Sequence, residues 1–94
     1  MKAKHTPGPW RVAYLDCNRQ SVVMGEHIEI ATCWHHSVGS IEKEMHANAR
    51  LIAAAPDLLE ALNAVEGAYQ CGADLNTVMD QVKSAIAKAN GESQ

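Results

Sequence analysis

The spacing of hydrophobic residues changes near residue 40. Before that point, apolar and polar residues alternate, which predicts a small antiparallel sheet of about three strands between Trp10 and Cys33. The segment SVVM, residues 21–24, is predicted as a middle or edge strand between turns at DCNRQ and GEH. The residues expected on common strand faces are Trp10, Val12 and Tyr14 in the first strand and Ile28, Ile30 and Thr32 in the last.

After residue 40, apolar residues return every three or four positions, which predicts three helices. The first is expected over residues 40–54. Pro56 lacks an amide proton and disfavours the helical conformation at the residue before it, so it predicts a corner from which a second helix continues over 56–70. The third helix is expected between Asp74, which caps it, and Gly91, which ends it.

These elements predict an α+β fold, in which a small N-terminal antiparallel β-sheet is followed by three α-helices. With 94 residues, the chain is expected to form a single domain over residues 1–94 with one modest core. Its predicted parts are an extended arm at 1–9, the sheet at 10–35, the helical part at 40–90 and a frayed tail at 91–94.

The composition predicts a thin core. The chain contains two Trp, two Tyr and no Phe, so its interior must be built mainly from Leu, Ile, Val, Ala and Met. Association of copies would bury more apolar surface per residue than one short chain can bury alone. We therefore expect a homo-oligomer.

The net charge of −3 argues against general DNA or RNA binding, which needs a surplus of Lys and Arg to neutralise phosphates. The first ten residues contain no apolar stretch of the kind a secretory signal has, and the longest apolar run, 51–55, is too short to span a bilayer. Three cysteines at unrelated spacings fit reduced thiols. These features predict a soluble cytoplasmic protein with no membrane partner.

Asn48 and Arg50 stand among aliphatic residues in ANARLIAAAPDLLEAL, residues 47–62. At about 100° per residue, Asn48 is expected on the apolar stripe of the first helix, and Arg50 on the opposite side with Lys43 and His46. An unpartnered buried amide costs about 1–3 kcal/mol, so Asn48 should bond backbone groups within the domain, a second subunit or a ligand. The stripe of Lys43, His46 and Arg50 is either a solvated face or a site for an anionic partner.

Two further groups of residues suggest binding chemistry. The residues able to ligate zinc are Cys17, Cys33, His35, His36 and His46, but their spacing lacks a Cys-x-x-Cys or His-x-x-x-His pair, so no metal site is predicted. Trp34, beside two imidazoles, either covers the sheet edge or stacks on a base or a partner side chain. Trp10 either anchors the N-terminal arm or offers a second stacking surface.

The sequence lacks the common signatures of catalysis. It contains no glycine-rich phosphate loop, nucleophile elbow or paired-carboxylate motif. A serine or cysteine near a histidine occurs in most small proteins and is weak evidence for catalysis on its own. We therefore expect no enzymatic activity and no cofactor.

Four landmarks make the chain similar to a large group of small phage and prophage proteins, many of which have no assigned role. They are HTPGPW at 5–10, IA at 30–31, ANARLIAAAPDLLEAL at 47–62 and AIAKANG at 85–91. Residues 16–44, which include CWHH, depart from this pattern. If function differs between members, we expect the difference to lie in that segment.

A sheet followed by long helices also resembles the architecture of phage anti-defence proteins that sequester nucleotide signals, such as the Thoeris anti-defence sponges. This resemblance implies capture of a nucleotide-type small molecule in the host cytoplasm, with Arg50, Lys43 and His46 meeting phosphates, Trp34 or Trp10 stacking a base, and Asn48 at a junction. One alternative is an anti-CRISPR-like inhibitor that binds a host defence protein through Glu42, Glu44, Glu60 and Glu66. A second alternative is an enzyme that degrades the messenger.

Overall fold

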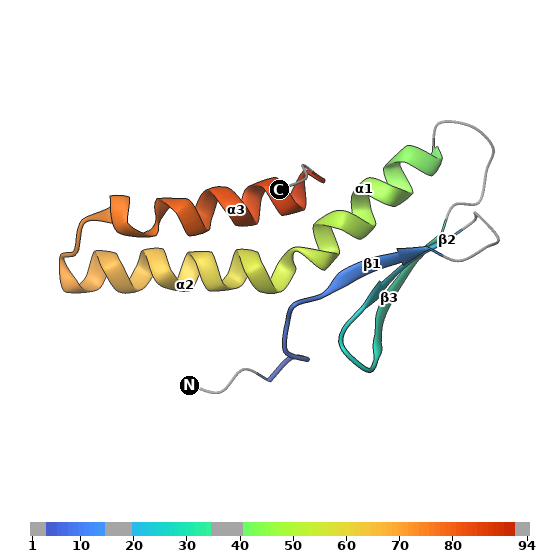
Figure 1. Cartoon of the computed structure of the whole chain (residues 1–94), viewed down its shortest axis with the longest axis horizontal. Coiled ribbons are helices and arrows are strands. Elements are labelled where there is room, and N and C mark those ends of the chain that lie inside the picture. Colours follow the sequence, from blue (N-terminus) through green and yellow to red (C-terminus); the bar gives the residue numbers. More distant parts are fainter. Residues whose placement is uncertain (1–3, 15–19, 35–40, 92–94) are drawn as a thin grey trace.

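The chain folds into a three-stranded sheet and a helical part, which confirms the predicted α+β class. The computed structural model describes residues 4–14, 20–34 and 41–91. Its elements are β1 (Arg11–Tyr14), β2 (Gln20–Met24), β3 (Glu29–Trp34), α1 (Ile41–Ala53), α2 (Ala55–Cys71), the 3₁₀ turn η1 (Leu75–Val78) and α3 (Met79–Ala89). Figure 1 shows α1 against the sheet, while α2 and α3 extend away from it as an antiparallel hairpin.

The sheet is antiparallel, with β2 in the middle between β1 and β3. Ser21 pairs with Cys33 and Val23 pairs with Ala31, and paired residues project from the same face of a sheet. Val23 packs against Ala49 of α1, so this row is the face that α1 covers. The strand that contains SVVM is therefore the middle strand, which is one of the two positions, middle or edge, that the sequence predicts for it.

The prediction that Ile28, Ile30 and Thr32 share one face of the last strand is wrong. Ile28 lies before β3 and is exposed, whereas Ile30 packs against the core together with Ala31 and Cys33. The cause is an irregularity in the pairing of β2 with β3 beside Met24, which places one extra residue in β3 and interrupts the simple alternation.

The central cluster of the core is built from valine and alanine, two of the residue types that the composition predicts for the core. Val23, Ala49 and Ala53 are almost completely buried and form one cluster. Alanine lets the backbone of α1 approach the sheet closely, because it adds only one methyl group between them. Most of the larger side chains that pack against this cluster are only partly buried.

A corner separates α1 from α2 at Ala54, one residue earlier than Pro56 predicts, because Ala55 already belongs to α2. The Ala54 amide donates to the Arg50 carbonyl at 3.1 Å, and the Leu58 amide donates to the Ala54 carbonyl at 2.9 Å. Pro56 occupies the first turn of α2, where its missing amide proton costs no helical hydrogen bond.

The N-terminal arm packs on this corner. A Cβ atom added at Gly8 would lie 2.9 Å from Cβ of Pro56, so the arm approaches the start of α2 with no room for a side chain. Trp10 packs beside the core, and its indole N–H donates to the Thr6 carbonyl at 3.1 Å. The HTPGPW and ANARLIAAAPDLLEAL landmarks therefore meet in space.

Gly8→Ala is expected to lower the free energy of unfolding by about 1–3 kcal/mol, because the new methyl group overlaps Pro56 and forces the arm away. Gly67→Ala is the matched control. No atom lies within 4 Å of a Cβ at Gly67, in the interior of α2, so alanine should be neutral or stabilise by up to about 1 kcal/mol. Urea unfolding of both variants measures the difference, and equal stability would show that the arm does not pack on the corner.

The two later helices end where glycine predicts. α2 ends at Cys71, Gly72 adopts a left-handed conformation with φ 74°, and the Ala73 amide donates to the Ala68 carbonyl at 2.9 Å. The Asp74 carboxylate then accepts from the Asn76 amide and caps η1, which leads into α3. Within the described residues, none of the helices combines the length and the apolar character needed to cross a membrane.

Candidate functional site

α1 divides the predicted site residues between two sides. Its buried stripe is formed by Met45, Ala49 and Ala53, which recur every four residues and face the sheet. At about 100° per residue, His46 and Arg50 lie on one side of this stripe and Asn48 lies on the other. These three side chains therefore do not share one surface of a single chain.

The prediction that Asn48 is buried is wrong, because its side chain is exposed. The sequence stripe was centred on Ile41 and Ile52, whereas α1 meets the sheet through Met45 and two alanines. α1 and the sheet approach each other most closely where the residues of α1 are small. The helix is therefore rotated so that its alanines face the sheet and Asn48 faces solvent. A carboxamide in solvent needs no protein partner. The Asn48 side chain is therefore no evidence for a contact with a second subunit or a ligand.

The prediction that His46 faces away from the sheet is wrong, because its ring meets Ser21 of β2. The Ser21 hydroxyl oxygen and His46 Nδ1 share a hydrogen bond of 2.5 Å, whose donor depends on the imidazole tautomer. Ser21 was not among the predicted site residues. The sequence did contain evidence for it, because the alternation in SVVM places this polar residue on the same strand face as the core residue Val23.

A hydroxyl beside an imidazole is also the pairing that activates a nucleophilic serine. Ser21 is completely buried in the described structure, with 0% of its surface exposed, so its hydroxyl does not face a substrate. The hydrogen bond instead joins the first half of α1 to the middle strand. Its geometry is that of a structural contact.

Arg50 lies against the end of α3 and is partly buried, so the prediction that it faces outward, away from the core, is wrong. A Cβ at Gly91 would overlap the Arg50 side chain at Nε. The hairpin brings this glycine back to α1, which local periodicity does not reveal. Among the described residues, the buried Nε atom of Arg50 has no hydrogen-bond partner.

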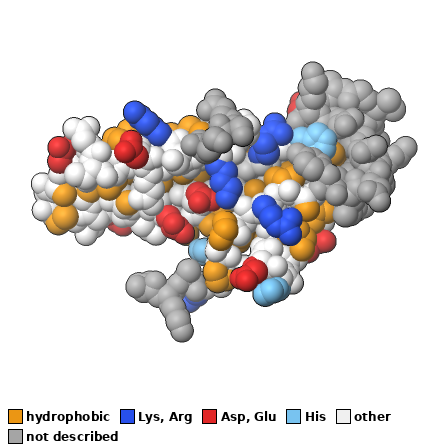
Figure 2. All heavy atoms as spheres, viewed as in Figure 1, with side chains coloured by type: hydrophobic (Ala, Val, Ile, Leu, Met, Phe, Trp, Pro, Cys, Tyr) orange, Lys and Arg blue, Asp and Glu red, His pale blue; other side chains and the backbone are white. Residues whose placement is uncertain are grey.

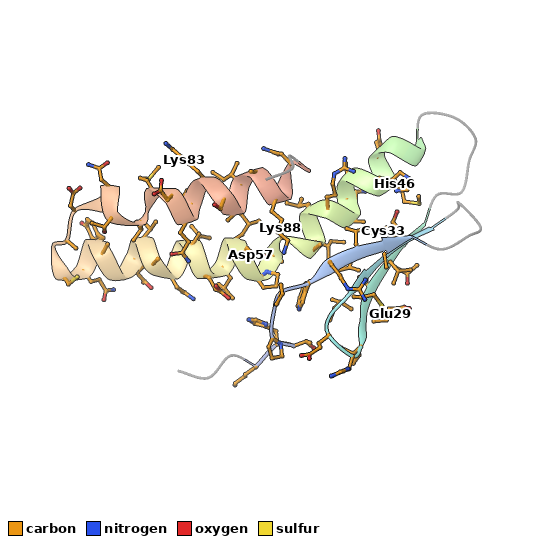
Figure 3. All side chains as sticks on the ribbon, viewed as in Figure 1. Glu29, Cys33, His46, Asp57, Lys83 and Lys88 are labelled. Atoms are coloured by element: carbon orange, nitrogen blue, oxygen red, sulfur yellow. The ribbon has the colours of Figure 1, made fainter. Side chains whose placement is uncertain are left out.

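Lys88 lies in the last turn of α3, just before Gly91, and its side chain bonds to α2. Its Nζ is 2.7 Å from Asp57 Oδ2, with side-chain exposures of 34% and 37% (Figure 3). Asp57 thus neutralises the charge of Lys88, whereas no described acidic side chain pairs with Arg50. We call Arg50, Asp57, Lys88 and Gly91 the α1–α3 junction. Figure 2 shows separate Lys and Arg side chains near α1, near the end of α3 and over the sheet.

Trp10, a predicted stacking residue, is partly buried and held by its own arm. Besides the bond to Thr6, its ring meets the His5 ring edge-to-face, with centroids 6.2 Å apart. The side chains of two other predicted ligand residues, Lys43 and Trp34, lie outside the described part of the structure. The predicted roles of those two residues therefore stay predictions.

Cys33 belongs to the sheet face below α1, and burial raises the pKa of its thiol. A raised pKa lowers the fraction of thiolate, which is the form that binds metals and attacks electrophiles. In the described ranges, no three His, Cys, Asp or Glu side chains come together as a metal site requires. Cys17, His35 and His36 lie outside those ranges.

The acidic residues of the alternative protein-binding hypothesis are spread over the surface. Glu44 is exposed on α1, while Glu60 and Glu66 are exposed on α2. At about 100° per residue, Glu60 and Glu66 project roughly 120° apart. They therefore do not form one acidic face on α2, and the side chain of Glu42 lies outside the described part.

Comparison with known proteins places the chain in a phage family. A family model described as Salmonella phage P22 protein Y8K6 matches residues 1–93. No curated protein and no solved structure matches the chain. The predicted relation to small phage proteins is confirmed, while the likeness to anti-defence sponges stays a prediction. Because the match spans nearly the whole sequence, the chain belongs to the family of the Salmonella phage P22 protein Y8K6.

Proposed function

We propose that this phage protein is an anti-defence binding protein that holds a nucleotide-derived immune signal without cleaving it. The signal would be of the cyclic nucleotide or cyclic ADP-ribose type. Capture alone is sufficient for such a role, because a protein made in quantity lowers the free concentration of any messenger that it binds below its active range.

The observation that carries the proposal is the state of Arg50 at the α1–α3 junction. Its guanidinium is partly buried, its Nε has no hydrogen-bond partner, and no described carboxylate pairs with it. An enclosed donor without an acceptor costs about 1–3 kcal/mol. A phosphate oxygen would supply the acceptor and the opposite charge together, and the planar fork of arginine suits phosphate.

A purely structural role for Arg50 makes a different prediction. The last carbonyls of α3 carry partial negative charge, so a cation beside Gly91 is favourable without any ligand. In that case, removing the charge would lower stability and would change no affinity. The two roles are therefore separated by measuring binding and stability on the same variants.

Arg50→Gln is expected to weaken ligand capture by about 10-fold to 100-fold, the loss of one charge-assisted hydrogen bond. The measurement is calorimetric titration with cyclic dinucleotides and cyclic ADP-ribose, combined with a thermal melt of each variant. Arg11→Gln is the control, because Arg11 is an exposed cation on β1 outside the junction. Its affinity should stay within about 2-fold of the wild type.

Ligand released by heat denaturation distinguishes the remaining hypotheses. Intact ligand supports capture, and chemically altered ligand would favour the messenger-degrading enzyme. If the wild type binds none of these nucleotides while Arg50→Gln only loses stability, the junction is structural. The inhibitor that binds a host defence protein would then be the better hypothesis.

A further inference from the structure

The buried apolar residues between α2 and α3 are alanines, whereas several large apolar residues of the two helices are exposed. Ala61, Ala68 and Ala85 are buried in the hairpin. By contrast, Leu62 is 67% exposed and Tyr69 is 78% exposed. A helix in a water-soluble fold normally turns its large apolar residues toward a partner, so these helices have a second face that this chain does not cover.

Large apolar residues that are exposed or half-buried form one stripe on each helix. On α2, Leu58, Leu62, Val65 and Tyr69 recur at intervals of four, three and four residues. On η1 and α3, the corresponding stripe has the same spacing and consists of Leu75, Met79, Val82 and Ile86. This spacing is the a/d pattern by which helices pack into bundles.

Both stripes lie on the same side of the hairpin. At about 100° per residue, the α2 stripe and the α3 residues Met79, Val82 and Ile86 are each displaced by roughly 80° in the same rotational sense from the alanines that join the two helices. Leu75 lies in the 3₁₀ turn before α3 and is exposed as well. Figure 1 shows that α2 and α3 run in opposite directions. Equal rotations on two antiparallel helices turn both stripes toward one side. We call this surface the hairpin face, and its most exposed large residues are Leu62, Tyr69, Leu75, Met79 and Ile86.

We propose that the hairpin face binds a second copy of this chain, forming a two-fold symmetric four-helix bundle. In this bundle, α2 of one protomer lies antiparallel to α3 of its partner, with the two-fold axis parallel to the helices. The sheet and α1 project outward from this bundle. This assembly goes beyond the proposed capture of a nucleotide and does not depend on it.

The area of the hairpin face fits a dimer. At about 200 Å² for each large apolar side chain, the exposed fractions of its five residues amount to on the order of 500 Å². That is most of the roughly 800 Å² that each partner contributes to a stable interface, before the half-buried residues beside it are included. Two copies would thus reach the size of an ordinary specific dimer.

The charges beside the hairpin face favour a second copy as the occupant. One charged side chain flanks the stripe on each helix, Glu66 on α2 and Lys83 on α3. At about 100° per residue, each lies on the side of its stripe that faces away from the other helix. Neither forms an ion pair within the described residues. In the proposed bundle, Glu66 approaches Lys83 of the partner subunit, and the symmetry makes this contact twice.

Leu62→Glu is expected to raise the dimer dissociation constant by at least about 100-fold, because it buries a carboxylate in the apolar centre of the bundle. Sedimentation equilibrium across a concentration series measures this constant. Leu51→Glu is the matched control, because Leu51 is 54% exposed on α1 and lies outside the hairpin. Its dissociation constant should stay within about 2-fold of the wild type.

A charge exchange tests the geometry of the interface. Glu66→Lys and Lys83→Glu should each raise the dissociation constant by about 3-fold to 10-fold, while the double variant should return to within about 2-fold of the wild type. Recovery in the double variant requires that the two residues face each other across copies. A wild-type protein that stays monomeric at about 100 μM, or a double variant as weak as either single one, overturns the proposal.

Discussion

Replacing Met45 with alanine is expected to lower the free energy of unfolding by about 2–5 kcal/mol. Met45 is the largest of the almost fully buried side chains, and it lies on the stripe of α1 that faces the sheet. Alanine would leave a cavity at this buried position, and a packed core relaxes only in part to fill such a cavity. Urea unfolding monitored by circular dichroism measures this loss.

Two further variants show whether the loss reflects the packing of α1. Met45→Leu keeps most of the volume and should cost less than about 1.5 kcal/mol. Leu51→Ala removes a similar number of atoms from the solvent side of α1 and should cost less than about 0.5 kcal/mol. A Met45→Ala loss no larger than that of Leu51→Ala would mean that α1 does not rest on the sheet through this stripe.

Ser21→Ala is the second substitution with a large expected effect, a loss of about 1–3 kcal/mol in the free energy of unfolding. The substitution removes the 2.5 Å hydrogen bond to His46 Nδ1 in a place that water does not reach, because Ser21 is completely buried. The imidazole loses this partner, and α1 loses one attachment to β2. Denaturant unfolding measures the loss, and calorimetric titration should show unchanged ligand capture.

Thr32→Val provides the comparison for Ser21. The Thr32 hydroxyl donates to Glu29 Oε2 at 2.8 Å, but this bond is exposed, so water replaces it at a cost of less than about 0.5 kcal/mol. A loss of chemical turnover in Ser21→Ala without a loss of stability would assign the serine to catalysis. It would contradict the structural role given to it above.

The helices were predictable because their boundaries depend on local chemistry. Pro56 determines the corner, Asp74 caps the turn before α3, and Gly72 and Gly91 adopt the left-handed conformations that end helices. Each of these effects acts within a few residues of its cause. The alternating pattern likewise predicted the sheet, although the irregularity beside Met24 shifted the face assigned to β3.

The candidate site was less predictable because it depends on long-range packing. The sequence contains Arg50, but its burial depends on Gly91, which the hairpin returns to α1 from the other end of the helical part. Asn48 was assigned to the wrong side because periodicity alone does not say which apolar residues of α1 approach the sheet most closely. Small residues make that contact, and they carry a weak hydrophobic signal in a sequence.

The central functional claim is that the protein captures a small anionic signal at the α1–α3 junction and leaves it unchanged. The most direct measurement is to recover wild-type and Arg50→Gln protein from cells that synthesise a cyclic nucleotide immune signal, denature both, and quantify the released nucleotides by mass spectrometry. We expect intact nucleotide at about one molecule per chain from the wild type and at least about 10-fold less from Arg50→Gln. Equal amounts from the two proteins, cleaved products, or no nucleotide from the wild type would contradict the claim.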